Sequence, residues 1–164
     1  MSNFYALPVL NEYIKFVVFD FDGVFTDGKI YYTQNGDSFK SFNFHDGYGL
    51  ILLKERGIKI GLITGHDTKI IDNMDRFINR FDYVYKGNKP KIEVLNEWRN
   101  LLGFDWKNIA FMGDDGPDKE CMKMCGSTAC PRDGTKLVQS VAHYRCKNNG
   151  GNGAVREFID HLLQ

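Results

Sequence analysis

The sequence has no excess of either charge and no long apolar run. Its 164 residues include 21 Lys and Arg and 21 Asp and Glu, so the formal net charge is zero. A neutral chain without a run of basic residues is a poor candidate for a general nucleic-acid-binding protein, although one local site could still hold a small anion. No apolar stretch approaches the roughly 20 residues that cross a bilayer. We therefore expect neither nucleic acid nor membrane as a partner.

The features of secreted and zinc-binding proteins are also lacking. Residues 1–14 have neither the basic segment nor the long apolar run of a signal peptide, so a cytoplasmic location is the expectation. The cysteines contain no C-x-x-C pair, which leaves a structural zinc site with little support. Cys121 and Cys125 are one helical turn apart, and we expect them to be packed thiols in a reducing compartment.

What the sequence does contain is an alternation of short apolar runs with helical stretches. With 43% hydrophobic and 26% charged residues and no repeat or linker, it predicts one globular domain over residues 1–164. The apolar runs have the composition of strands buried on both faces. The predicted strands span residues 14–20, 58–63, 82–85 and 108–112, and the predicted helices span 47–56, 67–79, 91–102 and 118–124. This order predicts an α/β fold with a Rossmann-like, doubly wound parallel sheet.

One segment interrupts the alternation. Residues 29–34 and 37–43 are β-prone and are joined by Asn35-Gly36, the preferred dipeptide of a two-residue type I′ turn. A hairpin over residues 29–43 has no place within a parallel layer, so it should project from the sheet. Its aromatic residues need burial, and we favour packing against another subunit over folding back onto the same domain. These aromatic residues are Tyr31, Tyr32, Phe39, Phe42 and Phe44.

Acidic residues follow two of the predicted strands. In α/β sheets, functional groups collect at the carboxyl ends of the strands. The first strand runs into a D-x-D motif of Asp20 and Asp22, whose side chains point the same way in an extended segment. Two such carboxylates repel each other unless a cation lies between them, and Mg²⁺ suits carboxylates together with a phosphate. The strand at 108–112 is followed by Asp114, so we expect Asp20, Asp22 and Asp114 to bind Mg²⁺.

Two further groups complete a possible phosphoryl-transfer site. Thr64 ends a strand beside Gly65 and can donate to a phosphate oxygen, and Lys91 opens a helix with a positive charge. In this hypothesis Asp20 attacks phosphorus, and Asp22 protonates the leaving alcohol and later deprotonates water. Lys91 and Mg²⁺ neutralise the phosphate charge. Each motif alone is weak, because solvated aspartates and Thr-Gly strand ends are common, but together they fall at strand ends in a coherent order.

These residues resemble the motifs of a known superfamily. The segment FDFDGVFTDG, residues 19–28, is similar to the first motif of the haloacid dehalogenase superfamily, whose first Asp is the nucleophile and second the acid/base. Thr64, Lys91 and residues 113–115 match the second, third and fourth motifs in the same order. The resemblance implies a Mg²⁺-dependent phosphoric monoester hydrolase that acts through an aspartyl-phosphate.

A closer resemblance is to the capless phosphatases of phosphorylated 3-deoxy-2-keto sugar acids, which act on octulosonate 8-phosphates or nonulosonate 9-phosphates. It is carried by VFTDG at 24–28, FNFHDGYGL at 42–50 and GGNGAVREF at 150–158. The resemblance implies no cap domain and a homotetramer with shared active sites, in which the hairpin builds the oligomer. A C-terminal glycine-rich tail and helix span about 150–164, and the tail before this helix would be flexible enough to reach a neighbour's site.

The resemblance also implies a set of substrate contacts and a substrate preference. Octulosonate phosphatases carry arginines at the positions of His66, Met74 and Ile51, and arginine is the usual partner of a carboxylate. Their loss favours a nonulosonate (sialic acid or KDN) 9-phosphate over KDO 8-phosphate. Segments 96–106 and 118–121, which resemble the C-terminal domain of animal sialic-acid CMP-synthetases, point the same way. The implied substrate contacts are Thr26, Asn43, His45, Asp46, Gly47, Gly65 and His66.

Two other classes of protein remain as alternatives. A non-catalytic oligomerisation module, like the domain of those synthetases, would have degraded acidic motifs, whereas here Asp20, Asp22 and Asp114 are present. A receiver-type signalling domain also needs an acidic cluster, a Thr and a Lys. Its phosphorylated Asp follows the third strand, however, and it lacks the acid/base that the D-x-D spacing supplies.

Overall fold

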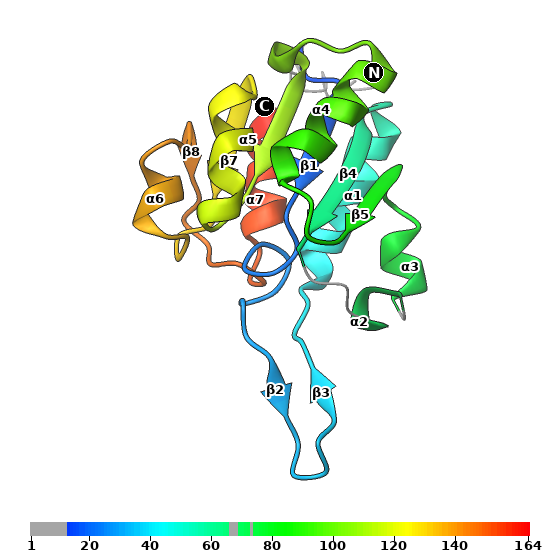
Figure 1. Cartoon of the computed structure of the whole chain (residues 1–164), viewed down its shortest axis with the longest axis vertical. Coiled ribbons are helices and arrows are strands. Elements are labelled where there is room, and N and C mark those ends of the chain that lie inside the picture. Colours follow the sequence, from blue (N-terminus) through cyan, green and yellow to red (C-terminus); the bar gives the residue numbers. More distant parts are fainter. Residues whose placement is uncertain (1–12, 66–68, 73) are drawn as a thin grey trace, which may run out of the picture.

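A computed structural model describes residues 13–65, 69–72 and 74–164. Its centre is a six-stranded parallel sheet in the order β5-β4-β1-β6-β7-β8 (Figure 1). The strands are β1 (Phe16–Phe19), β4 (Lys59–Thr64), β5 (Tyr83–Lys86), β6 (Ile109–Met112), β7 (Ser127–Cys130) and β8 (Tyr144–Arg145). The predicted α/β fold with a doubly wound parallel sheet is confirmed. No cap domain is evident among the described residues.

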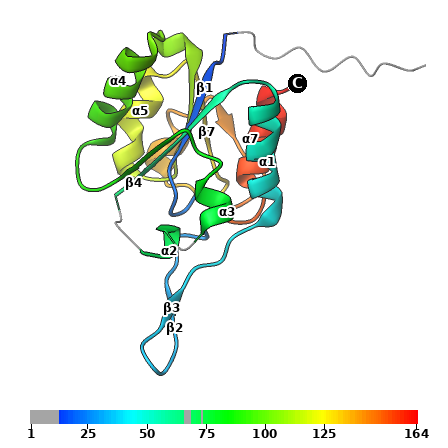
Figure 2. The same ribbon diagram turned by 90° about the vertical axis from the view of Figure 1, so that its right-hand side faces the viewer.

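Helices cover both faces of the sheet, with α1 and α7 on one side and α4 and α5 on the other (Figure 2). The helices are α1 (Phe44–Glu55), α2 (Lys69–Asp72), α3 (Asp75–Ile78), α4 (Lys91–Leu102), α5 (Lys119–Met124), α6 (Lys136–Gln139) and α7 (Ala154–Leu162), with 3₁₀ turns η1 (Trp106–Asn108) and η2 (Gly116–Asp118). None of these helices is long and apolar enough to cross a membrane.

The central strand β1 explains why its sequence is apolar without alternation. Successive side chains of a strand point to opposite faces. Val17 and Phe19 therefore join the core beneath α1 and α7, whereas Phe16 and Val18 join the core beneath α4 and α5. Because β1 pairs with β4 and β6, all four side chains are fully buried. This burial fixes the end of β1, and with it the start of the D-x-D segment.

Several elements differ from those expected. The stretch predicted as one helix over 67–79 contains two short helices, α2 and α3, and the residues described there pack Ile71 and Phe77 into the core. Strands β7 and β8 and helix α6 were not predicted. β7, with the sequence STAC, lacks a large apolar run and forms a strand through its pairing with β6. The four cysteines are buried free thiols, and the packed thiols expected at Cys121 and Cys125 are among them.

The hairpin projects from the carboxyl edge of the sheet as expected (Figure 1). Strands β2 (Tyr31–Tyr32) and β3 (Ser38–Phe39) are antiparallel, with Tyr31 opposite Phe39. The expected type I′ turn is wrong, because Gly36 has a positive φ of 87° but Asn35 does not. The Gly36 amide donates to the Thr33 carbonyl, and the Thr33 amide donates to the Asp37 carbonyl. The loop is therefore a three-residue turn with glycine in the left-handed position.

The hairpin aromatics fall into two groups. Tyr32 and Phe39 are 71% and 53% exposed, and Tyr31 stacks on Phe39 near the middle of the hairpin. Phe42 instead folds back onto its own domain, where its ring centre lies 4.5 Å from that of Phe77. Phe44 starts α1 and is largely exposed. Only part of the expected aromatic surface is therefore left uncovered by the chain itself.

Candidate active site

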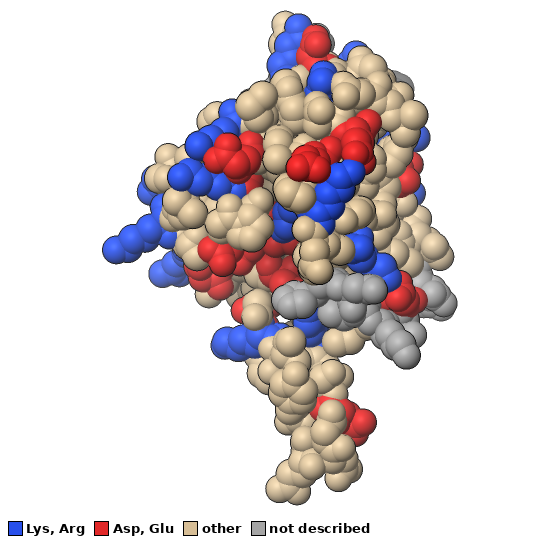
Figure 3. Space-filling view, in the orientation of Figure 1, with Lys and Arg blue, Asp and Glu red and all other residues tan. Residues whose placement is uncertain are grey.

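The predicted catalytic residues line one cavity of about 320 Å³ at the carboxyl edge of the sheet. Acidic side chains gather on this part of the surface, just above the hairpin (Figure 3). β1 supplies the segment after Phe19, β4 ends at Thr64, and α4 begins at Lys91. The cavity is lined by Asp20, Asp22, Gly28, Thr64, Gly65, Lys91, Asp114, Asp115, Pro117 and Asp118. The structure thus brings together groups from four separate segments.

A buried lysine holds two of the carboxylates. The Lys91 ammonium lies 2.8 Å from Asp20 Oδ1 and 2.6 Å from Asp118 Oδ1. The other oxygen of Asp118 accepts from the backbone amides of Asp114 and Asp115, at 3.0 and 3.2 Å. Both oxygens of Asp118 are therefore engaged, which suits it to position Lys91 and the loop after β6.

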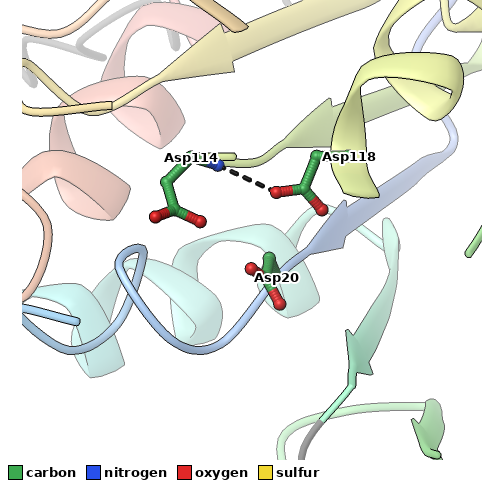
Figure 4. A group of neighbouring side chains, drawn as sticks. All are labelled: Asp20, Asp114 and Asp118. Carbon is green, nitrogen blue, oxygen red and sulfur yellow. Dashed lines mark hydrogen bonds between the residues drawn. The ribbon is translucent and has the colours of Figure 1, made fainter. Parts of the chain in front are cut away.

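The carboxylates Asp20, Asp114 and Asp118 present oxygens within 4.8 Å of one another (Figure 4). Burial and the charge of Asp118 raise the pKa of Asp20 well above its usual value, against the lowering effect of Lys91. Burial and the Asp118 charge likewise raise the pKa of Asp114 to about 6. Burial lowers the pKa of Lys91, but the Asp20 and Asp118 charges outweigh it and raise the value. A divalent cation among these oxygens would relieve the repulsion.

Glycines allow the loops of the site to approach each other. Gly23 has a positive φ of 81°, and a Cβ there would lie 2.0 Å from the Asp114 carboxylate. A Cβ on Gly113 would lie 2.3 Å from Cβ of Asp118. The Asp114 carboxylate consequently sits directly against the loop that follows Asp20. The donor set of Asp20, Asp114 and the adjacent backbone fits a small, oxygen-seeking cation.

The glycine-rich segment contacts this loop from the other side. The Gly151 amide donates to the Val24 carbonyl at 3.0 Å, and a Cβ on Gly150 would overlap the Gly23 carbonyl. Residues 150 and 151 are thus packed within their own chain, and the contact of this segment with a neighbour's site stays a prediction. Their glycines serve close packing against the D-x-D loop of the same chain.

Asp22 lies at the edge of the cavity and is held by two side chains. Its Oδ1 accepts from the Thr26 hydroxyl at 3.3 Å and from the Lys40 ammonium. Thr26 is fully buried, and its hydroxyl oxygen also accepts from the amides of Gly23 and Gly28. The expected substrate contact of Thr26 is thus replaced by a role in shaping the loop.

Most of the other expected substrate residues do not line this cavity. Asn43 caps the N-terminus of α1, and Asn43 and His45 line a separate cavity of about 520 Å³ beside α7. Asp46 is fully buried, and its carboxylate accepts from the amides of Gly153 and Arg156. The expectation that the Asp46 side chain contacts substrate is contradicted, because both of its oxygens cap the start of α7.

Gly47 and His66 complete the expected set. Gly47 is buried inside the first turns of α1, against Phe42 and Arg80. His66 lies outside the described residues. Of the six expected substrate residues that the structure describes, Gly65 lines the cavity with Asp20.

Sequence reasoning missed two residues of the site. Asp118 follows Asp114 by one turn, and the G-D-D-x-x-D spacing is a signal that could have identified it. Lys40 lies on the returning arm of the hairpin, and its contact with Asp22 depends on the tertiary path of that arm. No local pattern in the sequence indicates this contact.

A comparison with protein families identifies the chain. A model of the haloacid dehalogenase-like hydrolases matches residues 63–159. The chain belongs to this family. It is 33% identical over 152 residues to the 3-deoxy-D-manno-octulosonate 8-phosphate phosphatase of Escherichia coli (strain K12), covering 93% of this chain and 80% of that protein. The predicted superfamily and the predicted phosphatase class are confirmed.

Solved structures of the family share the fold. The octulosonate 8-phosphate phosphatase from Moraxella catarrhalis, in complex with magnesium, phosphate and KDO, is 32% identical with a TM-score of 0.85, and the match covers 92% of this chain and 86% of that one. The cobalt-bound octulosonate phosphatase from Haemophilus influenzae is 31% identical with a TM-score of 0.84, over 93% and 89% of the two chains.

Mg²⁺ should stabilise this protein much more at about pH 8 than at about pH 5. Because the pKa of Asp114 is raised to about 6, the carboxyl's contribution to stability is lost as the pH rises through that value. A bound cation offsets this loss at the higher pH, whereas protons compete for the same oxygens at the lower one. Melting temperatures with and without Mg²⁺ at both pH values test this.

The matched variants for this experiment are Asp114→Ala and Asp160→Ala. Asp114→Ala should abolish the Mg²⁺-dependent rise in melting temperature. Asp160 is partly exposed and paired with Arg156 on α7, so Asp160→Ala should leave this rise unchanged. An equal rise at both pH values, or a rise that survives in Asp114→Ala, would contradict the assignment of Asp114.

Proposed function

We propose that this protein is a Mg²⁺-dependent phosphatase of phosphorylated 3-deoxy-2-keto sugar acids, with Asp20 as its nucleophile. The observation that carries the proposal is the contact of Asp20 with Lys91 in a cavity that also contains Asp22, Thr64 and Asp114. A carboxylate can attack a phosphate dianion only where positive charge offsets their repulsion. Lys91 supplies part of that charge within hydrogen-bonding distance of the nucleophile.

Each residue of the cavity has a defined role in the proposed reaction. Asp20 attacks phosphorus, and an aspartyl-phosphate forms as the bond to the leaving oxygen breaks. Asp22 donates the proton to the leaving oxygen and later accepts one from the water that hydrolyses the intermediate. Thr64 and Lys91 hold the phosphate oxygens.

The metal is Mg²⁺ in this proposal, held by Asp20, Asp114 and the backbone carbonyl of Asp22. When bound, it neutralises charge on the phosphate and aligns it with the nucleophile. The magnesium and cobalt in the related structures support this cofactor. The carboxylates of this chain fit it because their oxygens converge and their mutual repulsion needs a cation.

Replacing Asp20 by Asn should lower kcat for 4-nitrophenyl phosphate in the presence of Mg²⁺ by a factor on the order of 10⁴ or more. The amide has nearly the same shape but is a poor nucleophile, so the melting temperature should show a folded protein. Asp160→Asn, which makes the same chemical change on the surface of α7, serves as the control. Substantial activity in Asp20→Asn would contradict Asp20 as the nucleophile, and no Mg²⁺-dependent activity in the wild type would favour the non-catalytic oligomerisation module.

Within this substrate class we infer a preference for a nonulosonate 9-phosphate over KDO 8-phosphate. Met74 packs against the apolar core, and Ile51 lines a surface cavity beside Arg80, so neither position offers a guanidinium group of its own. Arginine pairs with carboxylates in a bidentate way that these side chains cannot replace. The relatives from Escherichia coli and Moraxella catarrhalis are octulosonate 8-phosphate phosphatases, so a direct comparison of the two substrates on this protein tests the preference.

The ratio of kcat/KM values for the two substrates tests the preference. We expect the nonulosonate 9-phosphate to be hydrolysed with a kcat/KM at least about tenfold higher than that of KDO 8-phosphate. Both substrates should lose activity equally in Asp20→Asn, which controls for contaminating phosphatases. The reverse ratio would assign KDO 8-phosphate as the substrate and leave the phosphatase mechanism intact.

The proposed assembly is a homotetramer in which the hairpin contacts a neighbouring subunit and helps to cover the active site. Tyr32, Phe39 and Ile30 are exposed on a hairpin that extends away from the core of its own chain. Large apolar side chains contribute roughly 1.5 to 3 kcal/mol each when fully buried, so a neighbour that covers them gains considerable stability. The site has no cap domain of its own among the described residues, and a covered site excludes water.

Tyr32→Asp should dissociate the assembly and lower phosphatase activity, as measured by light scattering and steady-state assay. The new charge would have to be buried without a partner in the interface. Gln34→Asp is the matched control, because it places the same charge at the exposed turn of the same hairpin without removing an aromatic ring. A monomeric wild type with full activity would contradict the shared site.

A further inference from the structure

Lys40 is a buried lysine at the root of the hairpin. Its side chain is 3% exposed, although Phe39 and Ser41 on either side are exposed. Its ammonium donates to Asp22 Oδ1 and lies 5.6 Å from the centre of the Phe21 ring. Lysine is rarely buried unless its charge is paired. The Asp22 carboxylate therefore offsets the cost of burying the Lys40 charge.

The contact fixes the orientation of Asp22. The Thr26 hydroxyl donates to the same oxygen, Oδ1, at 3.3 Å, and Thr26 is itself held by the amides of Gly23 and Gly28. Donors from the loop after β1 and from the returning arm of the hairpin thus converge on one carboxylate oxygen. Rotation of the carboxylate would break both contacts, so its plane is set by Lys40 and Thr26 together.

We propose that Lys40 is a positioning residue for the acid/base Asp22, an inference that rests on the proposed phosphatase mechanism. The proton on Oδ2 of Asp22 passes to the leaving oxygen as its bond to phosphorus breaks and the bond from Asp20 to phosphorus forms. The resulting Asp22 carboxylate, paired with Lys40, then accepts a proton from the attacking water as the bond between Asp20 and phosphorus breaks. Lys40 keeps its own protons throughout and holds Asp22 through both steps.

The proposal predicts a dependence on the leaving group. Benzyl phosphate releases an aliphatic alcohol, whose oxygen must be protonated as it leaves, whereas 4-nitrophenyl phosphate releases a stable anion that does not need the proton. Lys40→Met should therefore lower kcat/KM for benzyl phosphate by about 10- to 100-fold, and reduce kcat/KM for 4-nitrophenyl phosphate far less. With the latter substrate, slow hydrolysis of the intermediate should appear as a burst of nitrophenolate.

A double-mutant cycle shows whether Lys40 acts through Asp22. Asp22→Asn alone should give the same dependence on the leaving group, with a larger loss. Lys40→Met should have no further effect on benzyl phosphate in that background, because the group that it orients is already inactive. Lys40→Arg should restore part of the activity by keeping a cation that donates to the carboxylate. Lys29→Met, which removes an exposed charge from the other arm of the hairpin, is the matched control.

The outcomes separate this proposal from the phosphatase mechanism. An equal loss of kcat/KM on both substrates, no loss on either, or an additive loss in the double variant would overturn the role of Lys40. Melting temperatures of the Lys40→Met and Lys40→Arg proteins establish that folded variants are compared, and the ratio between the two substrates is independent of the folded fraction. If instead Asp20→Asn retains Mg²⁺-dependent activity, the phosphatase mechanism itself fails.

Discussion

The repulsion among three carboxylates at the carboxyl edge of the sheet is the constraint on which the rest of the site depends. Asp20 follows β1, Asp114 and Asp118 follow β6, and their oxygens lie within 4.8 Å of one another. Lys91 is the buried cation that contacts two of them. A single ammonium cannot offset three carboxylates, as the raised pKa values of Asp20 and Asp114 indicate. The fold holds these groups in an arrangement that a metal and a phosphate complete.

This arrangement requires backbones that approach more closely than side chains allow. Gly23 faces the Asp114 carboxylate, Gly113 faces Asp118, and Gly150 lies on the carbonyl of Gly23. The D-x-D loop is therefore clamped between the loop after β6 and the segment before α7. Because the buried strands β1 and β6 fix the positions at which the segments carrying Asp20 and Asp114 begin, the position of Asp20 does not depend on surface contacts. The glycine-rich segment, which the sequence suggested was flexible, packs closely against this loop through Gly150 and Gly151.

The parts of the fold that the sequence predicted are those whose determinants are local. The apolar run ending at Asp20 identified the central strand, and the order of Asp20, Thr64, Lys91 and Asp114 along the chain identified the cavity because parallel strands align their carboxyl ends. β7 escaped prediction because its pairing with β6 decides its structure, and Lys40 because only the path of the hairpin brings it to Asp22. The conformation of the turn depends on which residues take positive φ. The dipeptide Asn35-Gly36 is compatible with both a two-residue type I′ turn and the three-residue turn that the structure shows.

The hairpin links two properties that are usually separate, the cover of the active site and the orientation of its acid/base. Its outgoing arm is tied to the D-x-D loop by the Tyr31 hydroxyl, which donates to Asp27, and its returning arm contributes Lys40 to Asp22. A neighbouring subunit that packs against the exposed aromatic residues of the hairpin would therefore also restrain both arms where they leave the domain. In a phosphatase without a cap domain, the hairpin that binds the neighbouring subunit would in this way also hold the group that transfers the proton. Assembly and proton transfer would then be coupled through the Tyr31–Asp27 and Lys40–Asp22 contacts.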